Sequence, residues 1–167
     1  MKKLGSLFFI VLSLTKVSVC FAQDKTDGKE TKRQLSLEQV ADDYKFGNGM
    51  NFWSLRKYDK ALEEFLEYLE IYHNGSHRGE AYARIAGIYF DRQYYLKAID
   101  YYKGLYEEFS DSEEGLEGYY NIGICYVKMG YDKQALEVFS KILRESPSSQ
   151  QAAKAQIQIE LLKLFKK

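Results

Sequence analysis

The two histidines are the residues best suited to binding a metal ion. His73 and His77 are four residues apart, a spacing that would suit a metal if both lay on one helix. Asn74-Gly75-Ser76 lies between them, however, and these residue types are typical of a turn. We therefore expect both histidines in a loop and predict no metal site.

Adjacent glutamates are the candidate acid and base residues. They occur as Glu63-Glu64, Glu107-Glu108 and Glu113-Glu114. Neighbouring residues on a helix diverge by about 100°, so two such carboxylates do not converge on one substrate. We expect these pairs on solvated helix faces, and we expect the last pair to complement the dipole at a helix start.

Neither a nucleophile nor a phosphate-binding loop is evident. Cys125 is the only cysteine beyond the leader described below, and no histidine lies near it in the sequence, so we expect a small buried hydrophobic residue. Gly47-Asn48-Gly49 lacks the strand and helix that phosphate binding needs around a glycine-rich loop. The sequence thus predicts no catalytic residue, no cofactor and no enzymatic activity.

A repeat of 37 residues sets the elements that would position any site. Five columns of residues share this interval: Gly49, Ala86 and Gly123; Phe52, Tyr89 and Tyr126; Ala61, Ala98 and Ala135; Phe65, Tyr102 and Phe139; Leu69, Tyr106 and Leu143. Repeats of this length indicate a solenoid of stacked supersecondary units. Apolar residues recur at steps of three and four on two successive segments of each unit, which predicts two helices per unit.

The predicted fold is all-α, with three helix pairs followed by a capping helix. We expect the pairs at residues 37–55 and 58–72, 76–92 and 95–109, and 112–129 and 132–145. Ser36 and Gln39 form a capping box that predicts the first helix start. The last helix, 148–165, is apolar on one side and polar on the other, as the end of a repeat array requires.

The third unit resembles the tetratricopeptide repeat. The residues that carry the resemblance are Ile122-Gly123, Tyr126, Gly130, Ala135, Phe139 and Pro147. The usual repeat has 34 residues, so each unit here carries three more, in the segments after each second helix. The first unit departs from the pattern at Lys45 and Asn48, and we expect Tyr44 to take the apolar role. The resemblance covers residues 36–165 and implies a right-handed α-α superhelix.

The longer repeat resembles those of bacterial envelope proteins, namely the periplasmic partner of the Tol–Pal system and the outer-membrane-assembly lipoprotein. Residues 1–22 fit this context as a signal peptide, with Lys2 and Lys3, an apolar run and a small residue at Ala22. The apolar run is too short to span a bilayer. An uncleaved anchor and a lipoprotein acylated on Cys20 are the alternatives.

Three segments follow from these patterns: a signal peptide at 1–22, a disordered polar spacer at 23–35 and a repeat domain at 36–167. We expect an exported, periplasmic protein, with lipid anchorage at Cys20 or secretion as alternatives. The net charge is zero, and without residues 1–22 the chain keeps 21 basic and 24 acidic residues. This balance argues against a nucleic-acid surface and gives no reason to invoke anionic lipid.

The first helix of each pair has a second face that would line the concave side of the superhelix. In tetratricopeptide proteins that face usually receives the ligand. The predicted groove residues are Phe46, Met50, Trp53, Phe90, Tyr120, Ile124 and Val127, with Ala83 and Gly87 between them. An exposed apolar groove of this kind marks a binding site, unless terminal helices or a second copy cover it.

The resemblance and this groove predict a non-catalytic adaptor that binds a protein or peptide partner in envelope assembly. The alternative is a self-associating structural component of a larger envelope or secretion complex. Neither hypothesis involves nucleic acid or a small-molecule cofactor, and the sequence leaves the oligomeric state open.

Overall fold

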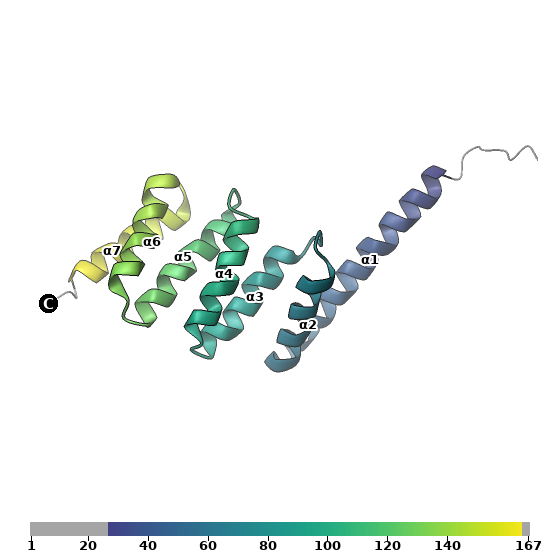
Figure 1. Ribbon diagram of the computed structural model, residues 1–167, viewed down its shortest axis with the longest axis horizontal. Coiled ribbons are helices and arrows are strands. Elements are labelled where there is room, and N and C mark those ends of the chain that lie inside the picture. The colour runs from purple at the N-terminus through teal and green to yellow at the C-terminus, as the bar shows by residue number, and fades with distance from the viewer. Residues whose placement is uncertain (1–26, 165–167) are drawn as a thin grey trace, which may run out of the picture.

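A computed structural model describes residues 27–164, and from residue 37 onward it also describes the side chains. Seven helices follow one another in this part of the chain: α1 (Asp27–Ser54), α2 (Tyr58–Ile71), α3 (Arg78–Asp91), α4 (Tyr95–Glu108), α5 (Glu113–Lys128), α6 (Asp132–Glu145) and α7 (Gln150–Leu164). They form the antiparallel pairs α1–α2, α3–α4 and α5–α6, with α7 at the end of the row (Figure 1). Each helix packs mainly on its neighbours in the chain, so the predicted all-α solenoid is confirmed.

The predicted helix bounds agree with the structure to within two residues, except at the start of α1. That helix begins at Asp27, so Ser36 lies inside it and most of the predicted spacer is helical. Residues 29–46 contain no glycine or proline, and their many Lys, Glu, Gln and Arg residues favour a helix, so nothing ends it at Ser36. The predicted signal peptide, with Cys20 and Ala22, lies outside the described residues.

In the first and third pairs, the backbone of one helix lies directly against an aromatic ring of the other. A Cβ atom added to Gly49 would lie 2.5 Å from Phe65, and one added to Gly123 would lie 2.4 Å from Phe139. Ala61, Ala98 and Ala135 are fully buried on the second helices. Small residues in these columns therefore let the paired helices approach closely, as predicted.

The first unit keeps the same register as the others. Tyr44 is 71% exposed, so the prediction that it takes the apolar role was wrong. Lys45 occupies the place of Tyr82 and Tyr119 and forms ion pairs with two carboxylates of α2, Glu64 at 2.8 Å and Glu67. A charged contact with α2 replaces the apolar one, because the long lysine side chain reaches solvated glutamates. Within residues 27–164, no helix has the length and hydrophobicity needed to cross a bilayer.

The first helix of every pair ends in the same left-handed turn. Arg56, Gln93 and Gly130 have φ angles of +57°, +62° and +75°, and they are 37 residues apart. In each turn this residue and the next donate their amides back to the helix, for example Gly130 to Val127 and Tyr131 to Tyr126, which is a Schellman motif. The third unit alone uses glycine, the residue that adopts this conformation without strain.

We predict opposite effects for two glycine-to-alanine substitutions. Gly130→Ala should destabilise the fold by about 1 kcal/mol, because alanine is strained at positive φ. Gly47→Ala should stabilise it by about 0.5–1 kcal/mol, because Gly47 lies in α1 with no atom within 4 Å of the added Cβ. Urea unfolding measures both free energies. The same sign for both substitutions would contradict the assigned backbone conformation.

Candidate functional site

The predicted groove residues lie on helices α1, α3 and α5, which stand side by side in the solenoid (Figure 1). Five of them are half-buried and keep part of their surface accessible: Met50, Trp53, Phe90, Ile124 and Val127. Contacts run across the units on this face, because the Arg84 guanidinium of α3 lies 5.0 Å from the Trp53 ring centroid of α1. We call these five residues, with Ala83 and Gly87, the A-helix face.

Two predicted groove residues belong to the core instead. Phe46 is 6% exposed and Tyr120 is 9% exposed. The Phe46 ring packs on Phe65 and stacks on His77, with the His77 ring centroid at 4.4 Å. The Lys154 ammonium lies 5.7 Å from the centroid of the Tyr120 ring. Side chains from the following unit therefore cover both rings, and the prediction that they are exposed was wrong.

Helix α7 extends the face beyond the three predicted rows. Ile157, Leu161 and Leu164 follow Tyr120, Ile124 and Val127 by 37 residues, and all three are exposed. We predicted from the amino-acid pattern that α7 is a cap, although the 37-residue interval also predicts its place on this face. Glu160 follows Gly123 by the same interval. A glutamate at that place leaves no room for an aromatic ring from a second helix paired with α7. Helix α7, the last helix of the described residues, thus contributes to the A-helix face.

Each unit places one carboxylate beside the A-helix face, and each carboxylate has a basic partner. Asp43 contacts His77 at 2.8 Å, Glu80 contacts Arg84 at 2.7 Å and Glu117 contacts Lys154 at 2.9 Å. Asp43, Glu80 and Glu117 are again 37 residues apart. The two strong bases described here, Arg84 and Lys154, are therefore engaged by the protein itself. This leaves the apolar surface as the main chemical feature of the face.

A buried network ties the α2–α3 loop to α1. Asp42 accepts hydrogen bonds from the Tyr68 hydroxyl and from the Ser76 amide and hydroxyl, the last two at 2.8 and 2.7 Å. The Tyr68 oxygen in turn accepts the His77 amide at 3.0 Å. Ser112 and Ser149 cap the next helix in the other two loops, but the corresponding residue here is Gly75, which has no side chain. In this loop Asp42 and Tyr68 instead accept the amides of Ser76 and His77, the two residues that precede α3.

The network also sets the ionisation of Asp42. Burial disfavours the carboxylate and raises its pKa, but the hydrogen bonds donated by Ser76 and Tyr68 outweigh burial, and the pKa of Asp42 lies below its usual value. Burial likewise raises the pKa of the Cys125 thiol to about 12, so this cysteine stays protonated at neutral pH. Cys125 is fully buried, which confirms its predicted packing role.

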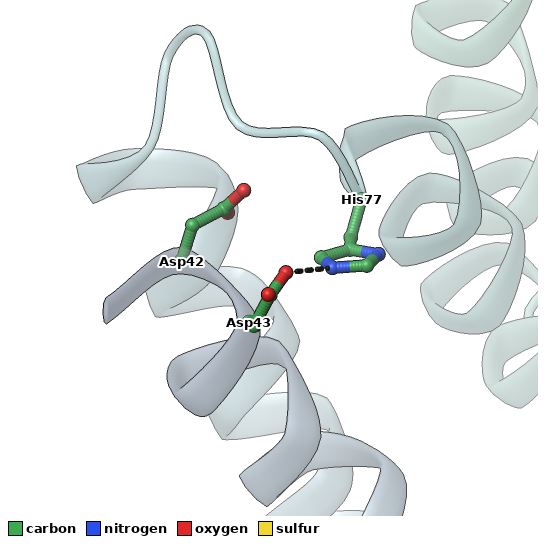
Figure 2. Close-up of side chains that lie close together, drawn as sticks. All are labelled: Asp42, Asp43 and His77. Carbon is green, nitrogen blue, oxygen red and sulfur yellow. Dashed lines mark hydrogen bonds and ion pairs between the residues drawn. The ribbon is translucent and has the colours of Figure 1, made fainter. Parts of the chain in front are cut away.

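Figure 2 shows Asp42, Asp43 and His77 together, with ligand atoms within 4.8 Å of one another. His73 lies in a turn and His77 just before α3, so both are outside helices as predicted. The residue pattern did not predict that His77 would contact α1. Both oxygens of Asp42 already accept hydrogen bonds, and the His77 ring is stacked on Phe46. We therefore interpret the cluster as the joint between the first two units.

Comparisons with known proteins agree with this geometry. A family model described as a tetratricopeptide repeat matches residues 116–149, which are most of the third unit. Two solved structures each match 73% of this chain: the Arabidopsis OM64 TPR domain, with a TM-score of 0.56, and the second TPR domain of human RPAP3 in complex with the HSP70 peptide SGPTIEEVD, with a TM-score of 0.54. The fold is a tetratricopeptide solenoid.

The match covers nearly all of each tetratricopeptide domain, 96% of OM64 and 98% of RPAP3. Sequence identity is 16% and 17%, so the likeness concerns the fold and not the ligand. No curated protein sequence matches the chain. Protein interaction is the general role of tetratricopeptide domains, and the RPAP3 domain holds a peptide.

We predict that Asp42→Asn destabilises the tetratricopeptide fold by about 1–3 kcal/mol at pH 7, because an amide cannot accept every bond that Tyr68 and Ser76 donate. A carboxyl whose pKa is lowered by folding contributes stability above its unfolded pKa, and that contribution is lost as the pH falls through the folded pKa. The difference in unfolding free energy between wild type and Asp42→Asn should therefore disappear as the pH falls below about 4. Urea unfolding across pH checks this.

Asp43→Asn is the matched control. Asp43 is exposed and contacts only the half-buried His77 ring in the pairs described here, so its loss should cost less than about 1 kcal/mol. A constant effect of Asp42→Asn at every pH would show that the carboxylate charge is not what stabilises the joint.

Proposed function

We propose that this protein is an exported, non-catalytic adaptor that binds an apolar segment of a partner protein on its A-helix face. The observation that carries the proposal is the continuity of that face across α1, α3, α5 and α7. Half-buried Met50 and Ile124 and exposed Leu161 lie in one 37-residue column. Such a strip of accessible apolar surface is typical of a binding site for an apolar helix or extended peptide.

The paired charges favour an apolar partner over an acidic one. An acidic peptide such as SGPTIEEVD, which the RPAP3 domain holds, would need basic side chains to receive its carboxylates. On the face described here, Arg84 and Lys154 already contact Glu80 and Glu117. Breaking these ion pairs would reduce the binding free energy gained from an acidic peptide. The partner of this chain should therefore bury aliphatic and aromatic side chains.

The proposed setting is the bacterial envelope, in outer-membrane or envelope assembly. It rests on the leader-like residues 1–22 and on the resemblance of the long repeat to envelope proteins. A periplasmic location follows if cleavage occurs after Ala22, and a lipid anchor follows if Cys20 is acylated.

A second candidate function is self-assembly into a larger envelope complex. The observation that favours it is an apolar face on α1, where Leu37, Val40 and Tyr44 are exposed within the part of the chain whose side chains are described. The places of Tyr44 in the next two units are held by Ala81 and Gly118, which the preceding pair buries. A second molecule would bury the α1 face in the same way. Sedimentation of wild type and Tyr44→Glu tests this function. If the protein self-assembles through this face, the variant should sediment as a smaller species than wild type.

We predict that Leu161→Ser combined with Leu164→Ser weakens partner binding by about 2 kcal/mol, because exposed apolar residues of a binding face contribute energy only when a partner covers them. The control is Ile71→Ser, an exposed apolar residue at the end of α2, away from the face. Crosslinking in the native envelope followed by affinity measurement with the captured partner gives the readout. An equal loss of partner affinity in both variants would exclude the A-helix face as the binding site.

Trp53 is a less suitable probe for this purpose. Its ring packs edge-on against Tyr58 with centroids 5.2 Å apart and lies beneath Arg84, so Trp53→Ala removes folding contacts as well. Its fluorescence should nevertheless shift when a partner covers the face.

The export part has its own test. Ala22→Asp should block cleavage, because signal peptidase accepts only small residues there. Intact mass of the exported wild-type protein should correspond to a chain that begins at Gln23. A mass that begins at Cys20 and includes acyl chains would establish the lipoprotein alternative, and an uncleaved chain would contradict both.

A further inference from the structure

The turns within the helix pairs form one edge of the solenoid. Figure 1 shows the α1–α2, α3–α4 and α5–α6 turns along its lower edge and the loops between pairs along its upper edge. We call the lower edge the turn edge and define it by residues 54–60, 91–97 and 128–134, which are related by the 37-residue interval. The upper edge consists of the equally long segments 71–77, 108–114 and 145–151.

The two edges carry opposite charge. The turn edge has three acidic residues, Asp59, Asp91 and Asp132, and seven basic ones: Arg56, Lys57, Lys60, Arg92, Lys97, Lys128 and Lys133. All seven except Arg92 are exposed, and Arg92 contacts Asp59 at 2.7 Å. The upper edge has no lysine or arginine and five acidic residues: Glu108, Asp111, Glu113, Glu114 and Glu145. The zero net charge of the chain therefore conceals a separation of charge across the fold.

The turn edge also exposes large apolar side chains among its basic residues. They are Leu55, Tyr58, Tyr94 at 58%, Leu96 at 65% and Tyr131. A shallow hollow of about 350 Å³ lies between the second and third turns and is lined by Tyr94, Tyr95, Leu96, Lys97 and Met129, together with Gln93. The Lys97 ammonium lies 5.9 Å from the Tyr94 ring centroid, so cation and ring are presented together.

This combination suits a flat anionic surface better than a peptide. A row of protruding turns forms a ridge, whereas peptide recognition uses a groove or a pocket. Tyrosine is favoured at the boundary between membrane and water, where its ring is apolar and its hydroxyl stays wet. Lysine and arginine near the surface are attracted by anionic headgroups. We propose that the turn edge docks on a membrane that contains anionic lipid, with Tyr94, Leu96 and Tyr131 at headgroup depth.

The test uses the full chain with Cys20→Ser, so that buried Cys125 is the remaining native thiol. An environment-sensitive fluorophore is attached at Gln93→Cys on the turn edge or at Ser148→Cys on the upper edge, both exposed positions. We expect the emission of the residue-93 label to shift to the blue with vesicles of phosphatidylcholine and phosphatidylglycerol, and to stay unchanged with phosphatidylcholine alone. The residue-148 label should show no shift with either vesicle.

A charge reversal at the turn edge gives the second arm. Lys57→Glu, Lys97→Glu and Lys133→Glu together should weaken vesicle binding about tenfold or more, because basic residues at the surface each contribute to binding. The matched control reverses three exposed charges away from the turn edge, Lys103→Glu, Arg144→Glu and Lys163→Glu, and should bind nearly as wild type does. Raising the salt from about 0.1 M to about 1 M should also weaken binding.

Three results would overturn the proposal. Equal shifts at residues 93 and 148 would mean that another part of the chain, such as residues 1–22, holds the protein on the vesicle. Equal loss in the two charge-reversed proteins would mean that net charge and not the turn edge is recognised. A shift at residue 93 with soluble polyglutamate or duplex DNA and none with vesicles would assign the edge to an acidic macromolecule instead.

Discussion

The close contact between a helix backbone and an aromatic ring is the constraint on which the structure depends. Phe65 and Phe139 lie so near Gly49 and Gly123 that no side chain fits between ring and backbone. In the first and third pairs this contact fixes the separation of the two helices, and buried Ala86 holds the corresponding place in the second pair. The first helices of successive pairs then stand beside one another, which makes one continuous face from residues far apart in the sequence.

The joints between units solve a second problem, which is the unpaired carbonyl groups at the end of each second helix. After α2, buried Arg78 donates to the Leu69 and Tyr72 oxygens at 2.9 and 3.0 Å and forms a bidentate pair with Glu108 of α4. Arg78 holds the pKa of Glu108 below its usual value, so the pair stays charged at neutral pH. After α4 the corresponding residue is Gly115, where the backbone packs directly on Phe109.

The apolar interior continues across these joints. One cluster of buried residues spans α1 to α3, and a larger one spans α3 to α7. Tyr89 and Tyr101 belong to both and stack with ring centroids 5.5 Å apart. The solenoid is thus one packed body with two chemically distinct surfaces. The A-helix face is apolar with internally paired charges, and the turn edge is basic and aromatic. The two proposed interactions use different residues, so a partner and a membrane can be held together.

The sequence by itself determined the helices, their pairing and the columns of the core, because a 37-residue interval and a helical period are local properties that the chain records directly. It also located Met50, Trp53, Phe90, Ile124 and Val127 on an accessible face. The tertiary structure decided which of the residues with this period stay exposed. Phe46 and Tyr120 share its period but are covered by His77 and Lys154, since burial depends on what the next unit places above a side chain. The Asp42 network and the charge difference between the two edges arise the same way, from residues that only the folded chain brings together.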